Sequence, residues 1–490
     1  MDINSFIKSV NDIIKNDVGV SDSVQRIEQT IWILFLKLYD ILEEEWELID
    51  LDFSSVIPEE FRWRNWAVDH MDGKALTSDA LLSFVNDRLL PALKSIAVVR
   101  AMPFRKIAVK SVFEDLNNYM KDGILLRQIV NVIDRLKLDT EDARQDFTCI
   151  FEKILQSLQS EKSTGVFYSP RPITDFMARM TEPKIGDRIA DFACGTGGFM
   201  ISSLKLLGDQ VKSSTDLRSL DRTFFGIEKK SFPYLLCMTN LFLHGIVDAE
   251  IWHDNSLSKN LRDYSSDELC DLILMNPTFA GNEKDSVRFN FPSSLRSTKT
   301  ADLFLTLAMY RLKPNGRASV LVQDSFMYGT DKIKTAIKKR LVNEFNLHTV
   351  IRLPNSVFAP FSQTATNIIF FDRRGMTEAI WVYRLDMPQG ARNFTAEKPL
   401  TSEHFRQIID WWHRREEISV NGLHKARRVT REEIAASNFN LDVCGFSAYS
   451  EETYPSPRDL IRLQRDVMTE RSGSLERKLA EIEAILEENA

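Results

Sequence analysis

The feature that most constrains the fold is an alternation of short apolar segments with amphipathic helical stretches between Glu161 and Asp372. Each short segment is rich in β-branched residues, which is typical of a buried strand. Strands that alternate with helices in this way form a mainly parallel sheet with helices on both faces, so the sequence predicts an α/β domain. The expected strands are Arg188–Asp191, Phe224–Ile227, Leu272–Met275, Ser319–Val322, Thr349–Leu353 and Asn367–Phe371.

The segment that precedes this region has a helical pattern throughout. Its clearest apolar stripe recurs at steps of three and four residues, which places the side chains on one face of a helix. The residues of this stripe are Ile27, Ile31, Leu34 and Leu38. We therefore predict an N-terminal helical domain over residues 1–160 and an α/β domain over residues 161–412.

A helical tail is predicted at the other end of the chain, within a C-terminal region that we place at residues 413–490. From Pro457 onward the pattern is strongly helical, and it contains an apolar seam with coiled-coil spacing. The residues of this seam are Leu475, Leu479, Ile482 and Leu486. A lone helix of this length is marginal in water, so the seam predicts docking to a partner.

Composition excludes several classes of protein. The chain has 490 residues, of which 43% are hydrophobic and 27% charged, as in ordinary globular domains. The apolar run Ile31–Leu36 is too short to span a bilayer, and Met1–Asn4 lacks the basic start of a secretory signal, so we expect a cytoplasmic protein without a membrane segment. The 5 cysteines have neither the paired spacing nor the histidines of a zinc site, so we expect no metal and buried, reduced thiols.

A glycine-rich turn, Asp191–Phe199, follows the first predicted strand and leads into a helix predicted at Met200–Leu207. Glycines let the backbone approach a ligand closely, helix-start amides point at it, and an acid at the strand end can bind a cationic amine. This arrangement suits the methionine part of S-adenosylmethionine. A phosphate loop would end in Gly-Lys-Ser/Thr, which is absent here, whereas a dinucleotide site and a simple tight turn remain open. The expected cofactor contacts are Asp191, Ala193, Gly195, Thr196, Gly197 and Gly198.

Acidic residues also end the next predicted strands. Glu228 follows Gly226–Ile227, where a carboxylate can accept hydrogen bonds from both hydroxyls of a ribose. Asp254 follows Trp252–His253, where it would face the adenine of the cofactor. Each acid by itself would be expected on the surface. Their positions at successive strand ends, together with Asp191, favour one cofactor site.

The tetrapeptide Asn276–Phe279, with the sequence Asn-Pro-Thr-Phe, follows the apolar strand that ends at Met275. The exocyclic amine of adenine is a poor nucleophile because its lone pair is delocalised into the ring. Two acceptors that bind the hydrogens of this amine favour the tetrahedral geometry of methyl transfer. The side-chain oxygen of Asn276 and the carbonyl oxygen of Pro277 can be these acceptors, and Phe279 can stack on a base flipped out of a duplex. An isolated Asn-Pro is a common turn, but its place after the cofactor loop favours catalysis.

Taken in order, these motifs resemble the modification (methyltransferase) subunits of type I restriction-modification systems, and the resemblance extends over nearly the whole chain. Gly165–Pro172 is similar to the family's Phe-Tyr-Thr-Pro segment, which lines the cofactor pocket. The resemblance therefore implies cofactor contacts from Phe167, Tyr168, Ser169 and Pro170. Other similar blocks are Gln29–Lys37, Thr300–Phe304, Leu312–Arg317, Ile351–Asn355 and Asn438–Asp442.

The resemblance implies a Rossmann-like S-adenosylmethionine-dependent methyltransferase that methylates the N6 amine of adenine in double-stranded DNA. Asn276, Pro277 and Phe279 would be catalytic, and Asn276 would also contact the cofactor. The partners would be a specificity subunit, which reads the DNA sequence, and a restriction subunit, which cuts, with two modification subunits for each specificity subunit. The net charge of -7 then requires a basic cleft within an acidic surface, or a partner that holds most of the DNA.

Departures from the family pattern leave other interpretations open. The family usually has Pro where this chain has Phe192 and Thr278, and commonly Lys where it has Ala365. Pro277 still supplies its carbonyl, but a small displacement of reacting groups costs large rate factors. The alternatives are an active enzyme subunit, a catalytically degenerate S-adenosylmethionine-binding scaffold of the same complex, and a solitary methyltransferase for RNA or protein. The helical domain, the tail and Asn276 argue against the third, and the active enzyme subunit is our main interpretation.

Overall fold

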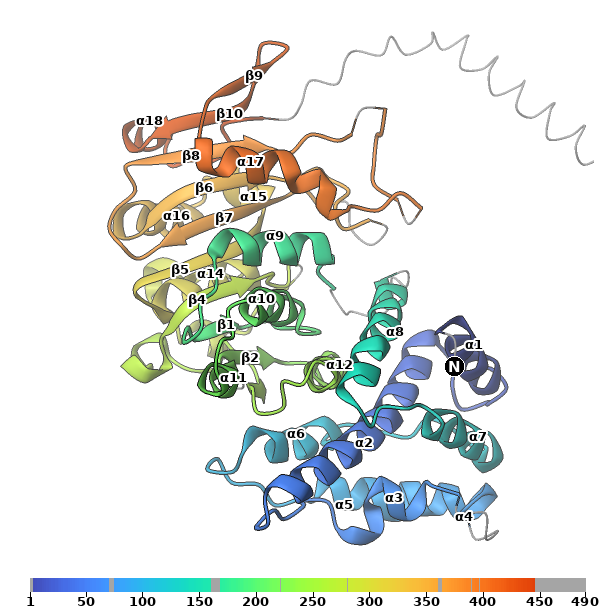
Figure 1. Cartoon of the computed structure of the whole chain (residues 1–490). Coiled ribbons are helices and arrows are strands. Elements are labelled where there is room, and N and C mark those ends of the chain that lie inside the picture. The colour runs from blue at the N-terminus through green and yellow to red at the C-terminus, as the bar shows by residue number, and fades with distance from the viewer. Residues whose placement is uncertain are drawn as a thin grey trace, which may run out of the picture. The chain divides into compact units, whose positions relative to one another are not determined.

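The computed structural model describes residues 3–69, 75–159, 168–220, 222–279, 281–359, 364–388, 390–395 and 397–445. Phe167 and the predicted tail seam lie outside these residues. Met1–Ser419 and His424–Gly445 form one compact unit, which contains the N-terminal helices and most of a large sheet (Figure 1). A second unit contains Val420–Leu423 and the residues from Phe446 onward.

The N-terminal region is helical in the part that the structure describes, as the sequence predicts. Its α-helices are α1 (Ile3–Ile14), α2 (Ser23–Ile49), α3 (Trp63–Trp66), α4 (Ser78–Ser83), α5 (Leu90–Lys94), α6 (Phe104–Phe113), α7 (Gly123–Asp134) and α8 (Glu141–Gln159). The region also contains a short 3₁₀ helix, η1 (Glu59–Phe61), and a short π-helix, η2 (Phe84–Leu89).

Helix α2 organises this region because its middle is buried. It begins where the Asp22 side chain accepts the backbone N–H of Gln25, which satisfies one donor of the first turn. On the same helix, the buried ammonium of Lys37 donates to the carbonyl oxygens of Ile133 at 3.1 Å and Leu136 at 2.6 Å. These carbonyls lie at the C-terminal end of α7, where a cation complements the helix dipole. Lys37 therefore ties α2 to α7.

The sheet has ten strands in the order β3-β2-β1-β4-β5-β7-β6-β8-β10-β9. Their bounds are β1 (Ile189–Asp191), β2 (Phe224–Glu228), β3 (Glu250–His253), β4 (Cys270–Met275), β5 (Leu312–Gln323), β6 (Asn346–Arg352), β7 (Thr366–Asp372), β8 (Ala379–Arg384), β9 (Ile418–Val420) and β10 (Leu423–Thr430). The strands from β3 through β5 are parallel, β7 is antiparallel to both β5 and β6, β6 is parallel to β8, and β10 is antiparallel to β8. The predicted α/β fold with a mainly parallel sheet is confirmed.

Helices cover both faces of this sheet, and alternate side chains of its strands pack into two different hydrophobic cores. On β4, Leu272 and Leu274 pack into one core, whereas Ile273 and Met275 pack into the other. The α-helices from residue 171 onward, in the described part of the chain, are α9 (Arg171–Thr181), α10 (Gly198–Gly208), α11 (Ser214–Leu220), α12 (Ser231–Leu243), α13 (Asp285–Arg288), α14 (Thr300–Arg311), α15 (Asp324–Tyr328), α16 (Lys332–Glu344), α17 (Arg406–Arg414) and α18 (Arg431–Ala436). Short turns of helix are η3 (Leu261–Asp263), η4 (Ser266–Glu268), η5 (Ser293–Leu295) and η6 (Ser402–Phe405).

The strand order places a topological switch between β1 and β4. From β1 the chain continues outward through β2 and β3, whereas β4 and β5 extend the sheet in the opposite direction. Connections that leave neighbouring parallel strands in opposite directions open a crevice at their carboxyl ends. The cofactor loop after β1 and the tetrapeptide after β4 both begin at this crevice.

The late segment Asn438–Asp442 is fastened to the sheet by a buried charge cluster. Arg352, at the end of β6, pairs with Asp324 at 2.6 Å and also with Asp442. The amide of Asn367 donates to Asp324 at 2.7 Å. The sheet also continues past residue 412, where we placed the end of the α/β domain, because β10 pairs with β8.

The thiols differ from the expectation at one position. Cys194, Cys237, Cys270 and Cys444 are buried and unpaired, but Cys149 is exposed, so the prediction of buried thiols is wrong there. Cys149 lies on the outward side of α8, where a small residue meets solvent instead of the core. Within the described ranges no group of His, Cys, Asp and Glu is arranged to hold a metal ion. Over the same ranges, no helix combines the length and apolar character needed to cross a membrane.

Candidate active site

The loop between β1 and α10 is a tight turn that requires its glycines. Gly195 and Gly197 have φ values of 54° and 79°, a region that residues with a Cβ rarely adopt. A Cβ on Gly197 would also lie 3.1 Å from the Sγ atom of Cys237. The turn is closed by the N–H of Gly197, which donates to the carbonyl of Cys194 at 2.8 Å. The glycines thus let the chain pass directly from the strand end into α10.

Asp191 is a buried carboxylate at the base of this loop. Asp191 is only 2% exposed, and its carboxylate accepts a hydrogen bond from the N–H of Ala193 at 3.0 Å. No basic side chain in the described part of the chain forms an ion pair with it. Burial raises the pKa of Asp191 to about 8; the hydrogen bond from Ala193 opposes this rise and the charge of Glu228 adds to it. An ammonium group beside Asp191 would supply the missing positive charge.

Glu228, at the end of β2, faces the same loop. Its carboxylate accepts the N–H of Gly195 at 3.0 Å and that of Lys230 at 2.9 Å. Burial raises the pKa of Glu228, although these backbone hydrogen bonds oppose the rise. Asp254 follows β3 and its N–H donates to the carbonyl of Glu228 at 3.1 Å, but its side chain is exposed. The structure therefore brings Glu228 into the site and leaves the Asp254 carboxylate at its edge.

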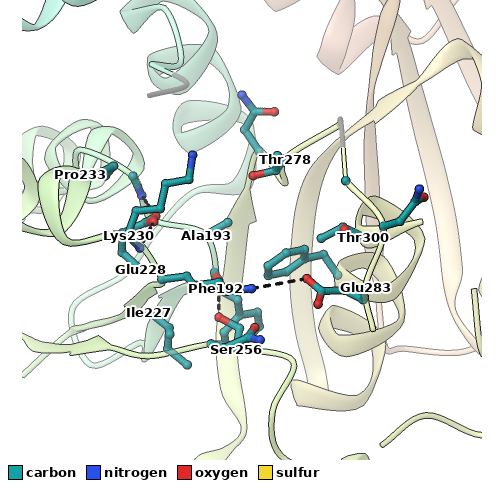
Figure 2. A pocket seen from close by; sticks show the side chains of 17 residues that line it. Phe192, Ala193, Ile227, Glu228, Lys230, Pro233, Ser256, Thr278, Glu283 and Thr300 are labelled. Atoms are coloured by element: carbon teal, nitrogen blue, oxygen red, sulfur yellow. Dashed lines mark hydrogen bonds and ion pairs between the residues drawn. The ribbon is translucent and has the colours of Figure 1, made fainter. Parts of the chain in front are cut away.

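A cavity opens between this loop and the tetrapeptide (Figure 2). Its walls come from the ends of β1, β2 and β4, the turn after β3, and the start of α14. The lining residues are Phe192, Ala193, Gly195, Ile227, Glu228, Lys229, Lys230, Pro233, Asn255, Ser256, Asn276, Thr278, Gly281, Asn282, Glu283, Thr300 and Phe304. Ala193, Gly195, Glu228 and Asn276 were predicted from the sequence, and the cavity brings them together.

Several predicted contacts lie behind this lining. Asp191, Thr196, Gly197 and Gly198 belong to the loop but do not form the cavity wall, and Pro277 is buried beneath it. Thr300 and Phe304 line the cavity although no role was predicted for them. The block Thr300–Phe304 resembles a family block, so that resemblance was the signal for them. Asn255 and Ser256, which directly follow Asp254, also line the cavity, and the contact from Asp254 stays a prediction.

Phe192, which stands at the family's proline position, belongs to a packed aromatic cluster. Phe192 is 1% exposed, and the centre of its ring lies 6.1 Å from that of Phe225. The buried guanidinium of Arg311 lies 4.8 Å from the Phe192 ring and 4.4 Å from that of Tyr264. Cation–π contacts and edge-to-face packing hold such a cluster together. The loop is therefore stiffened by packing where the family uses a proline.

Asn276 has one satisfied and one unsatisfied end. Its Nδ2 atom donates to the hydroxyl of Ser169 at 2.9 Å. Its Oδ1 atom is buried and has no hydrogen-bond partner among the described residues. A buried acceptor without a partner costs stability, which is typical of a group reserved for a ligand.

Phe279 points to a second cavity on the other side of the tetrapeptide. The lining residues are Phe279, Lys299, Ala301, Asp302, Leu305, Val322, Gln323, Ser325, Phe326 and Lys334. The Phe279 ring is half-buried and lies 6.3 Å from that of Phe358, edge to face. Ala365 borders this region, because its carbonyl accepts the N–H of Asp324 at 3.0 Å. An aromatic ring three residues after Asn276 thus lines this second cavity.

The segment that starts at Tyr168 is anchored to the helical region. The Tyr168 hydroxyl donates to Glu152 of α8 at 2.8 Å, and Arg171 Nε donates to the same carboxylate at 2.9 Å. Arg171 Nη1 also donates to the carbonyl of Gly198 at 2.7 Å. Burial alone would raise the pKa of Glu152, but the hydrogen bonds and charge of Arg171 outweigh it and hold this pKa below its ordinary value.

A Rossmann-like sheet with acids after β1 and β2, and Asn-Pro after β4, defines a class: S-adenosylmethionine-dependent methyltransferases that act on an amino group. Comparisons with known proteins extend this assignment. Residues 142–454 match the N-6 DNA Methylase family, and residues 3–133 match the HsdM N-terminal domain family. The chain is 41% identical over 486 residues to the Type I restriction enzyme EcoEI methylase subunit of Escherichia coli, and the match covers 98% of each chain.

Solved structures give the same result. A structure described as a modification subunit of a type I restriction enzyme from Vibrio vulnificus YJ016 superposes with a TM-score of 0.77 at 34% identity, over 88% of this chain and 92% of that one. A chain from a structure on complex assembly and conformational transition of the type I R-M system has a TM-score of 0.80 at 30% identity, over 97% and 98%. This chain belongs to the family of type I restriction-modification methylase subunits, whose catalytic part is an N6-adenine DNA methyltransferase domain. The enzyme interpretation is supported, and the scaffold interpretation is not favoured.

The residues of the cavity fit S-adenosyl-L-methionine, the cofactor of this family. Asp191 does not line the cavity but belongs to the loop that does; it is a buried carboxylate without a cation among the described residues, and the cofactor carries an ammonium group. Ala193 and Gly195 bring backbone into the wall of the cavity. Glu228 lies in the same wall and offers carboxylate oxygens to hydroxyl groups.

Proposed function

We propose that Asn276, Pro277 and Phe279 carry out the methylation of adenine N6 within a type I complex. The observation that carries this proposal is the buried, unpartnered Oδ1 atom of Asn276 at the carboxyl end of β4. An oxygen in this position can accept one hydrogen of the target amine, and the carbonyl of Pro277 can accept the other. Both contacts draw the nitrogen toward the tetrahedral geometry in which its lone pair attacks a methyl group. Bound S-adenosylmethionine supplies that methyl group in an electrophilic form.

Phe279 would hold the target base outside the duplex. A base buried in a DNA stack is inaccessible, so enzymes that modify it turn it into a pocket. The Phe279 ring borders the second cavity, which leaves an aromatic face for the adenine ring. Thr278, the residue before Phe279, is exposed and lines the cofactor cavity.

The cofactor contacts that we propose follow from the charges of the site. Asp191 would bind the ammonium of the methionine part, and Glu228 would accept the ribose hydroxyls. Asn255 and Ser256 are candidates for the adenine edge in addition to Asp254, because they line the cavity. Tyr168, Ser169, Pro170, Thr196, Gly197 and Gly198 remain predicted contacts, and Phe167 lies outside the described residues.

We further propose double-stranded DNA, a specificity subunit and a restriction subunit as partners, with two modification subunits for each specificity subunit. The support is the family itself, since the Escherichia coli relative is named a methylase subunit of a type I restriction enzyme. The C-terminal seam is the docking element that we expect. DNA as substrate and unpaired cysteines suit the reducing cytosol, where we place the protein.

The test is methyl transfer from labelled S-adenosylmethionine to duplex DNA by the complex with its specificity partner. Asn276→Ala should lower kcat by at least about 100-fold, because a preorganised transition-state acceptor is lost. Its affinity for S-adenosylmethionine should stay nearly unchanged. Asn117→Ala, at an exposed asparagine of the helical region, is the matched control and should be fully active. Equal activity of Asn276→Ala, or a product methylated on cytosine, would contradict the proposal.

A further inference from the structure

We propose that Ser169, which the family resemblance predicts as a cofactor contact, is a positioning residue that holds the Asn276 amide. The hydroxyl of Ser169 accepts a hydrogen bond from Asn276 Nδ2 at 2.9 Å, and this leaves Oδ1 for the target amine. The inference rests on the proposed role of Asn276. It assigns a partner to the catalytic side chain from a distant part of the sequence.

The orientation matters because the two ends of an asparagine amide have opposite hydrogen-bonding character. The oxygen only accepts and the NH₂ group only donates, although their sizes are nearly equal. Rotation of the Asn276 amide by half a turn would present donors to the target amine, whose own hydrogens then have no acceptor. A hydroxyl can accept from Nδ2 or donate to Oδ1, so Ser169 fixes where the amide group lies, and the observed bond from Nδ2 leaves Oδ1 without a partner among the described residues.

The Ser169 hydroxyl can act in this way because the neighbouring residues hold its backbone. Tyr168, before it, is 6% exposed and bonds through its hydroxyl to Glu152 of α8. Arg171, after it, bonds to the same carboxylate and to the carbonyl of Gly198 at the start of α10. The segment is therefore fixed to both the helical region and the cofactor loop. A short hydroxyl side chain on a fixed backbone holds its oxygen in one place.

The experiment measures methyl transfer by the complete complex with Ser169→Ala and Ser169→Thr. Ser169→Ala should lower kcat by about 100-fold, since small misplacement of a reacting group has effects of this size. Its S-adenosylmethionine affinity and its KM for DNA should stay unchanged. Ser169→Thr keeps the hydroxyl and should restore most of kcat. Ser214→Ala, at an exposed serine on α11, is the matched control and should match the unmodified chain.

Several outcomes would overturn the proposal. Weaker S-adenosylmethionine binding by Ser169→Ala with an unchanged kcat would show a cofactor contact instead. An equal loss of kcat in Ser169→Thr would show that packing matters and the hydroxyl does not. If Ser169→Ala keeps full activity while Asn276→Ala is inactive, only the positioning role fails. If Asn276→Ala is itself active, the proposed function fails.

Discussion

Two buried carboxylates lie at strand ends of the same sheet, and they differ in whether the chain supplies a cation. Asp324, directly after β5, pairs with Arg352 at the end of β6, which also pairs with the half-buried Asp442, and the amide of Asn367 donates to Asp324. Asp191, at the end of β1, has no such cation among the described residues. Burial raises the pKa of Asp324 as well, but Arg352 and Asn367 oppose the rise. For Asp191 the pKa reaches about 8.

The difference separates groups that hold the structure from groups that await a ligand. A buried ion pair is costly to break, because removing one partner leaves the other charge unpaired. A buried carboxylate without a cation already bears that cost in the folded protein. Buried carboxylates whose pKa is raised, at a loop that lines a cavity, are therefore candidates for function, whereas carboxylates paired with a cation are structural. Asn276 follows the same rule, because its Nδ2 atom donates to Ser169 whereas its Oδ1 atom has no hydrogen-bond partner in the described part of the chain.

The largest effect is expected where the paired cluster is broken. Arg352→Met should lower the free energy of unfolding by about 3–5 kcal/mol, because the buried Asp324 and the half-buried Asp442 lose their cation. Chemical denaturation measures this change. The folded fraction should still bind S-adenosylmethionine normally, since Arg352 does not line the cofactor cavity. Arg428→Met, at an exposed arginine, is the control. A stability loss no larger than that of Arg428→Met would mean that the cluster is not structural.

A smaller effect, confined to DNA, is expected at Phe279. Phe279→Ala should weaken capture of the flipped base by about 1–3 kcal/mol, the usual contribution of base-aromatic stacking. Fluorescence of 2-aminopurine at the target position reports base flipping and checks this directly. Cofactor affinity should not change, because Phe279 lines the second cavity and not the first. Normal base flipping by Phe279→Ala would contradict the proposal that the Phe279 ring holds the target base.

The smallest effect is expected at Thr278. Thr278→Pro restores the family's second proline and should preserve or slightly raise the rate of methyl transfer. The Thr278 side chain is exposed, so its loss removes little packing. A strongly reduced rate, measured by the same labelled transfer, would mean that the hydroxyl of Thr278 has a role in the site.

The parts of the fold that the sequence predicts are those with local signals. β4 and β7 are nearly continuous apolar runs, so their burial follows from composition. β10 has the sequence LHKARRVT, whose charged residues hide its strand character, and it was not predicted. The glycine-rich loop and the tetrapeptide were found for the same local reason.

The remaining features depend on contacts between distant residues. Phe192 meets Arg311 only because β1 lies beside the end of α14 in the folded chain. Ser169 and Asn276 are 107 positions apart, and no spacing rule joins them. The sequence also placed the acid after β3 in the site, whereas the fold turns Asp254 outward and brings Asn255 and Ser256 to the cavity.

The most direct test of this account is Asp191→Asn, measured for both stability and cofactor binding. The folded pKa of about 8 lies above the usual value near 3.9, so the contribution of Asp191 to stability is present below pH ~3.9 and is lost as pH rises through about 8. Without cofactor, Asp191→Asn should therefore be more stable than the unmodified protein at pH ~8.5, by more than about 1 kcal/mol. Its S-adenosylmethionine affinity should fall by about 10- to 100-fold, as for a lost charged hydrogen bond. A variant that is less stable, or that binds the cofactor normally, would contradict the claim that this carboxylate is reserved for a ligand.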